Sequence, residues 1–225
     1  MICASGLLAQ EENIIRIKSG QEAEQALPMD VKYRYPEFRQ GTISFYNGQT
    51  SSGRLNYNLL LGEMQFINLT RDTLSLAEEQ TIREIQIGDH TFHYDVKYGF
   101  VEVVQEYPTA RLAIQQKLTP LSREKMGAYE QSTGVSSIRD YSSISTSNGS
   151  TQKLALKGDL LIAKKVVYVF IDKNQRFRRA NRAGILRIFP ENKREINTFI
   201  EEHKTDFSQP EDLKALLRFC QEVAS

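Results

Sequence analysis

Between Tyr33 and Asp172 the sequence alternates apolar and polar residues with a period of two, and this feature restricts the fold most strongly. A period of two places every second side chain on one face of a β-strand. No long helical pattern separates the alternating stretches, so the strands are expected to pair antiparallel. We predict about eight to ten short strands in a sandwich, a barrel or a strongly curved sheet. The clearest stretches are Thr42–Tyr46, Arg54–Asn58, Glu63–Ile67, Phe92–Val96, Phe100–Gln105, Arg111–Leu118 and Lys165–Ile171.

Two dipeptides mark tight turns in this region. Asn47-Gly48 and Gly88-Asp89 each join two alternating stretches. Asn, Asp and Gly tolerate the backbone conformations that two-residue hairpin loops require. Both dipeptides are therefore expected to connect neighbouring antiparallel strands.

After Asp172 the period changes to 3.6, which is typical of amphipathic helices. Ile196, Phe199 and Ile200 form one such apolar stripe, and Pro190 ends a short helix before it. Each helix has only one apolar stripe and would be marginal alone. The helices are therefore expected to pack on the sheet, on each other or on a partner.

The last helix begins near Ser208 and Glu211, which have capping-box spacing. It is expected to bury Cys220 as a small core residue. The predicted fold class is α+β: a mainly antiparallel β domain over residues 30–175, followed by a C-terminal helical cap over residues 178–225 that packs on it.

A serine-rich segment, residues 132–151, interrupts the strands and contains eight Ser and three Thr. Such a composition buries too little apolar surface to offset the entropy lost on ordering. We expect a mobile loop, which is either a lid or recognition loop or a tolerated surface insertion.

The first ten residues resemble the end of a secretory signal. They are small and apolar, they stop before Glu11-Glu12, and Ala9 lies where a signal peptidase would cut. A basic stretch and a full apolar region are missing, so either the natural chain begins further upstream or the given sequence starts inside the signal. The alternative is an apolar N-terminus that packs on the body. We expect an exported protein, periplasmic or at the cell surface, with residues 1–10 as a signal remnant.

Composition argues against several kinds of site. The 225 residues include two cysteines, Cys3 and Cys220, and three histidines, which are too few for a disulfide framework or a zinc cage. His90 and His93 lie three apart on a predicted strand and so point to opposite faces. No run of about 18 apolar residues is present, so we expect no transmembrane span. We predict no metal site and no cofactor.

Motifs for catalysis and phosphate binding are also missing. The sequence contains no G-x-S-x-G elbow, no G-x-x-x-x-G-K loop and no G-x-G-x-x-G after a strand. The adjacent carboxylates of Glu78–Glu79 and Glu201–Glu202 are better explained by solvated surfaces than by acid–base catalysis. Asp172 begins a stretch like a calcium loop, but Gln175 and Arg176 stand where ligands and a glycine are needed. We predict no catalytic residues.

Positive charge is concentrated in one part of the chain. Residues 153–194 contain 12 Lys and Arg against 3 Asp and Glu, a local charge of +9 in a chain of +1. Such a region can attract phosphate, anionic lipid or acidic glycans, or it can neutralise the acidic remainder. No stacking motif accompanies it, so nucleic acid is not expected as a partner. The possible anion-binding patch, called the basic patch below, comprises Lys173, Arg176, Arg178, Arg179, Arg182 and Arg187.

Three segments resemble a group of exported bacterial proteins of unknown function. They are the G-x-hydrophobic-x-F-x-N-G frame from Gly41 to Gly48, Leu55-Asn-Tyr-Asn58 with Glu63-Met-Gln-Phe66, and the stretch from Phe189 to Ile200. The resemblance implies export and a sheet with a helical tail, and it supplies no activity. Within it, Asn56 and Asn58 point away from the face of Leu55 and Tyr57, where their amides could fix turns or contact a ligand.

These expectations lead to one leading function and two alternatives. The leading function is a non-catalytic binding or scaffolding module of the cell envelope, with an envelope protein, anionic lipid or glycan as partner. The first alternative is a carrier of an apolar, lipid-like ligand in a pocket between curved sheet and helices. The second is a hydrolase, which would need a cleft lined by groups of shifted pKa. Strand order and oligomeric state stay open.

Overall fold

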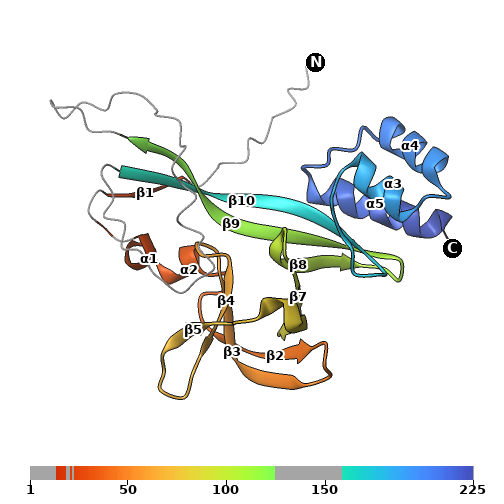
Figure 1. Cartoon of the computed structure of the whole chain (residues 1–225). Coiled ribbons are helices and arrows are strands. Elements are labelled where there is room, and N and C mark those ends of the chain that lie inside the picture. Colours follow the sequence, from red (N-terminus) through yellow and green to blue (C-terminus); the bar gives the residue numbers. More distant parts are fainter. Residues whose placement is uncertain (1–13, 19–20, 22, 125–158, 225) are drawn as a thin grey trace. The chain divides into compact units, whose positions relative to one another are not determined.

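The computed structural model describes residues 14–18, 21, 23–124 and 159–224 (Figure 1). The predicted signal remnant and the serine-rich loop lie outside the described residues. The chain divides into two compact units, one of residues 1–28 and 118–165 and the other of residues 29–117 and 166–225. Strands β9 (Ala110–Glu124) and β10 (Asp159–Asp172) run through both units.

The first unit contains two short elements, β1 (Ile15–Ile17) and α1 (Ala23–Ala26). β1 pairs antiparallel with β10, with Ile17 opposite Leu160. Both side chains are buried, which fixes this three-residue strand at the edge of the sheet through its apolar contacts.

The second unit contains the remaining elements, and most of its strands follow the alternating stretches of the sequence. Its N-terminal and sheet elements are α2 (Met29–Lys32), β2 (Arg39–Phe45), β3 (Thr50–Asn58), β4 (Glu63–Ile67), β5 (Thr73–Ser75), the 3₁₀ turn η1 (Glu79–Thr81), β6 (Ile82–Ile87), β7 (His90–Asp95) and β8 (Gly99–Glu106). Its C-terminal elements are β11 (Phe177–Arg179), α3 (Arg182–Ile188), α4 (Lys193–Glu202) and α5 (Pro210–Val223).

The described strands form one open sheet in the order β1-β10-β9-β8-β7-β6-β2-β3-β4-β5, and β11 pairs with β10. The pairs whose register is defined are all antiparallel. The α+β class with a large antiparallel sheet is therefore confirmed. The sheet does not close, because β1 and β5 lie at its two ends, so the barrel is not the form adopted.

Both predicted hairpin turns are confirmed. Asn47-Gly48 joins β2 to β3, and Gly48 has a φ of 85°, a left-handed conformation that favours glycine. The Asn47 side chain accepts a hydrogen bond of 2.9 Å from the Gln49 backbone, which closes the turn. Gly88-Asp89 joins β6 to β7 in the same way.

The strand β3 is buried on both of its faces at its C-terminal end. Leu55 and Tyr57 lie in the apolar core, and Tyr57 packs against Phe92 with ring centroids 6.1 Å apart. Asn56 and Asn58 are also fully buried. The face that carries them is therefore covered as well, and their amides must find partners inside the protein.

These two amides fix backbone turns, as the ordinary interpretation of the sequence predicted. The Asn56 side chain accepts from the Tyr35 backbone at 3.1 Å and donates to the carbonyl oxygens of Tyr35 at 2.8 Å and Glu37 at 3.2 Å. The Asn58 side chain accepts from the backbone of Leu60 at 3.0 Å and also from that of Leu61. Asn56 thus holds the segment before β2 against the sheet.

The three C-terminal helices of the second unit lie together (Figure 1) and pack on residues of β9 and β10. The predicted apolar residues of the last helix, Cys220 among them, are all fully buried. This cluster, called the helical core below, comprises Ala110, Leu112, Phe170, Ala180, Ile185, Phe189, Ile196, Ile200, Leu213, Leu216, Leu217 and Cys220.

The predicted capping box at the start of α5 is wrong. Gln209 occupies the N-cap, makes no side-chain capping bond, and precedes Pro210 in the first turn. The Ser208 backbone N–H and hydroxyl instead donate to the Asp206 side chain at 2.8 and 2.7 Å. The local turn therefore uses the hydroxyl that the capping box would have needed.

None of the helices in the described ranges is long and apolar enough to cross a membrane.

Candidate functional site

The structure divides the predicted basic patch between two faces. Arg178 and Arg179 are neighbours on β11, opposite Phe170 and Val169 of β10, so their side chains leave opposite faces of the sheet. The Arg178 guanidinium lies 3.9 Å from the carboxylate of Asp172, and its Nε is buried without a hydrogen bond. Arg178 is thus drawn inward and away from its neighbour.

The remaining members of the basic patch are exposed. Arg182 donates to Glu201 of α4 at 2.7 Å, so its charge is partly compensated. The other four have no ion-pair partner among the described residues; they are Lys173, Arg176, Arg179 and Arg187. The structure therefore brings no single constellation of six cations together, and anion binding by the exposed members stays a prediction.

A buried carboxylate lies at the centre of a polar cluster in the second unit. Glu102 of β8 has a side chain that is 5% exposed, and it accepts two hydrogen bonds from the Arg34 guanidinium, at 2.7 and 2.9 Å. The Nδ1 of His90 lies 2.6 Å from Glu102 Oε1, the oxygen that also accepts from Arg34 Nη2. Burial alone would raise the pKa of Glu102, but its bonds to Arg34, joined by His90, outweigh this and lower the pKa.

The ring of Tyr35 completes this cluster. The guanidinium groups of Arg34 and Arg39 lie 5.1 and 4.7 Å from its centroid, and His90 contacts it edge-on at 5.5 Å. Burial raises the pKa of Tyr35 to about 12. We interpret the cluster as a structural tie between β7, β8 and the segment before β2. Sequence reasoning missed it, although Glu102 shares the inward face of β8 with Phe100.

The two histidines of β7 belong to separate clusters, as their spacing predicted. His93 donates from Nδ1 to the Arg83 carbonyl oxygen at 3.0 Å, and its Nε2 accepts from Arg111 at 3.2 Å. Burial lowers the pKa of His93. In the described part of the chain, no three His, Cys, Asp or Glu side chains come close enough to hold a metal ion.

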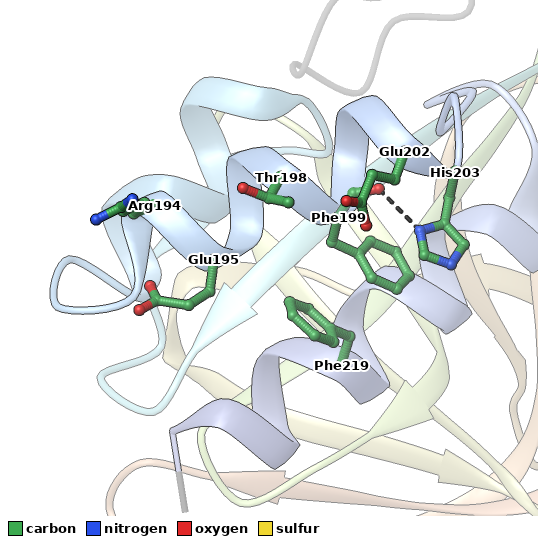
Figure 2. Close-up of a pocket in the computed structure, with 7 residues that line it drawn as sticks. All are labelled: Arg194, Glu195, Thr198, Phe199, Glu202, His203 and Phe219. Carbon is green, nitrogen blue, oxygen red and sulfur yellow. Dashed lines mark hydrogen bonds between the residues drawn. The ribbon is translucent and has the colours of Figure 1, made fainter.

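An open groove lies on α4 and α5 (Figure 2). It has a volume of about 510 Å³. Residues from one face of α4, the residue that follows α4, and one ring of α5 line it. These residues, called the helical groove below, are Arg194, Glu195, Thr198, Phe199, Glu202, His203 and Phe219.

Three aromatic rings form a column in the helical groove. The Phe199 ring stacks on Phe219 with centroids 4.4 Å apart and on His203 with centroids 4.0 Å apart. His203 donates from Nδ1 to the Phe199 carbonyl oxygen at 3.0 Å, the bond drawn in Figure 2. This bond fixes the orientation of the His203 ring beside Phe199.

The charges of α4 are reversed relative to its helix dipole. Lys193 and Arg194 begin the helix, and Glu201 and Glu202 end it, with no basic residue in the last turn. Acidic residues stabilise a helix when they lie near its N-terminus and destabilise it when they lie near its C-terminus. Glu201 is compensated by Arg182, whereas Glu202 has no ion-pair partner among the described residues.

Sequence reasoning placed these residues differently. It assigned Phe199 to the buried stripe of α4 with Ile196 and Ile200, and only the latter two are buried. Phe199 is half-buried and faces the groove. Glu201 and Glu202 were interpreted as a solvated pair, which is right for their exposure but ignores the reversed charge pattern that was already visible in the sequence.

Comparison with known proteins gives no match: no family model, no curated protein and no solved structure is similar to this chain. The resemblance of the Leu55–Asn58 and Glu63–Phe66 segments to exported bacterial proteins therefore stays a prediction.

Proposed function

We propose that this chain is a non-catalytic binding module of the cell envelope, and that the helical groove is its docking site for a protein partner. The observation that carries the proposal is the column of Phe219, Phe199 and His203 in an open groove. Aromatic side chains are enriched where proteins bind one another, because they bury a large area at low entropic cost.

The base of the groove is rigid, which suits a docking site. Ile196 and Ile200 of α4 and Leu216 and Cys220 of α5 are buried in the helical core directly beneath the exposed faces. The backbone that presents the rings is thus fixed by packing before a partner arrives. Pre-organisation of this kind lowers the entropic cost of binding.

The groove also contains polar groups at both ends of α4, which supply specificity. Arg194 lies in the first turn, and Glu202 lies at the last position of the helix. A partner therefore meets an apolar centre with charged margins, the usual arrangement of a protein interface. The export part of the proposal rests on the sequence of the first ten residues and on the resemblance to exported bacterial proteins.

No specific observation favours either of the two alternative functions. A carrier would need room between the sheet and the helices, and the described residues there form the closely packed helical core. A hydrolase would need a nucleophile beside a base, and the Glu102–His90 pair has no Ser or Cys hydrogen-bonded to it in the described ranges. We therefore favour the binding module.

Site-specific photo-cross-linking in the native host tests the proposal. Thr198 is exposed in the groove, and Tyr46, which is 62% exposed at a hairpin turn, is the matched control position. Each is replaced in turn by a benzophenone-bearing residue. We expect one defined adduct from position 198 that Glu202→Lys abolishes, and no such adduct from position 46. Absence of an adduct at 198, or the same adduct from both positions, would contradict the proposal.

A further inference from the structure

We propose that the helical groove, at the C-terminal end of α4, binds the guanidinium group of an arginine side chain presented by the protein partner. This inference rests on the proposed function and assigns the chemistry of the occupant. It is carried by the convergence of Glu202, His203 and the aromatic column at one end of one helix.

The first contribution is an uncompensated negative charge. Glu202 is exposed, and no ion pair to it exists among the described residues. The carbonyl groups at the end of α4 add the negative end of the helix dipole to the same place. Glu201, the preceding residue, is instead compensated by Arg182.

The second contribution is the fixed position of His203, the residue that follows Glu202. The Nδ1–H of His203 is used by the Phe199 carbonyl oxygen, so its ring is held flat against Phe199. A guanidinium has five N–H donors and no acceptor. The Glu202 carboxylate thus presents acceptors for a ligand that only donates, beside a ring whose position is already set.

The third contribution is a flat aromatic surface. Phe199 stacks on both of its neighbours, so Phe219 and His203 are the two ends of the column. A planar guanidinium stacks on aromatic faces, whereas a lysine ammonium is a compact, strongly hydrated charge. The column therefore favours arginine over lysine.

The cation at the other end of the groove does not neutralise this site. Arg194 lies eight residues before Glu202 on α4, which corresponds to about 12 Å along the helix axis. Figure 2 shows the Arg194 side chain directed away from the three rings. Arg194 and Glu195 thus lie at one end of the groove, and Glu202 lies at the other end beside His203.

Nuclear magnetic resonance titration of the full chain with a defined probe tests the inference. The probe is the N-acetyl, N′-methylamide form of arginine, and the matched neutral probe is the same derivative of citrulline, which keeps the shape and loses the charge. We expect saturable shifts of the His203 and Phe199 ring signals with the arginine derivative and none with the citrulline derivative.

Two variants make the test specific. Glu202→Gln should weaken binding of the arginine derivative about threefold to tenfold, because one charge-assisted bond and one ion pair are lost. Glu211→Gln, on the exposed surface of α5, should leave the binding unchanged. Glu202 is exposed, so its replacement should leave the fold intact.

Equal shifts from both probes, or unchanged binding in Glu202→Gln, would overturn the guanidinium assignment. The cross-linking from position 198 does not depend on arginine, so a defined adduct together with equal shifts would leave the docking site standing and refute only its chemistry. Absence of the adduct would refute the proposed function itself.

Discussion

Gly41 and Gly53 face each other across β2 and β3, and they form a matched pair for testing how tightly the sheet is packed. A Cβ added to Gly41 would lie 2.7 Å from the backbone oxygen of Gln86 and 2.8 Å from the Cδ1 of Leu55. A Cβ added to Gly53 would meet nothing within 4 Å. Neither glycine has a positive φ, so the two substitutions differ in crowding alone.

The expected free energies follow from this difference. Replacing glycine by alanine in a strand favours folding by about 0.5–1 kcal/mol, because the unfolded chain loses freedom. Gly53→Ala should show this gain. At Gly41 the backbone of β6 or the side chain of Leu55 must move, and overpacking of a filled core costs about 1–3 kcal/mol. Because the gain from the unfolded chain is the same at both positions, Gly41→Ala should be less stable than Gly53→Ala by the overpacking cost, about 1–3 kcal/mol.

Urea denaturation followed by far-ultraviolet circular dichroism measures this difference as a shift in midpoint at unchanged slope. We expect the midpoint of Gly41→Ala to fall and that of Gly53→Ala to rise slightly relative to the parent chain. If both variants shift by the same amount in the same direction, the close packing of β2 between β3 and β6 is refuted.

Further predictions concern the buried polar groups and the last helices. Glu102→Gln should cost about 2–3 kcal/mol, since it breaks a largely buried pair with partly exposed Arg34, and chemical denaturation measures it. Because the folded-state pKa of Glu102 is lowered, its ionised carboxylate stabilises the fold above about pH 4.3, and this stabilisation is lost as the pH falls through the folded pKa. The free energy of unfolding should therefore fall less steeply with decreasing pH in Glu102→Gln than in the parent chain. Asn56→Ala leaves three backbone groups without partners and should cost about 2–3 kcal/mol; equal thermal midpoints would contradict this. Burial raises the pKa of the Cys220 thiol to about 12, so peptide mapping after iodoacetamide treatment should find it unmodified until the chain unfolds. Glu202→Gln should raise helix stability by a few tenths of a kcal/mol on thermal denaturation, because it removes a carboxylate from a helix C-terminus.

The local elements could be predicted from the sequence because their signals are local. The alternation in Glu63–Ile67 coincides with β4, and Asn47-Gly48 forms the predicted hairpin. The order of the strands could not be predicted, because β6 pairs with one edge of β2, from which it is distant in sequence, whereas β3, β4 and β5 extend the sheet from the other edge of β2. Such pairing depends on the whole core rather than on any single segment.

The candidate sites were likewise predictable only in part. Charge summed along residues 153–194 indicates a basic region, but it does not reveal that Arg178 and Arg179 leave opposite faces of the sheet. Periodicity assigned Phe199 to the apolar stripe of α4, and it cannot distinguish the centre of a stripe from its margin. The unfavourable position of Glu201 and Glu202 relative to the helix dipole could be recognised from the sequence. Departures from a local stability rule of this kind are expected at functional sites.

The docking groove and its arginine site are tested most directly by the sequence of the partner peptide that is joined to a benzophenone at position 198. Mass spectrometry determines this sequence in the parent chain and in Glu202→Gln. We expect a single envelope protein, a cross-linked segment that contains arginine, and a lower yield of the adduct in the variant. A segment without a basic residue whose yield is unchanged by Glu202→Gln would contradict the arginine site. The absence of any adduct would contradict the docking groove.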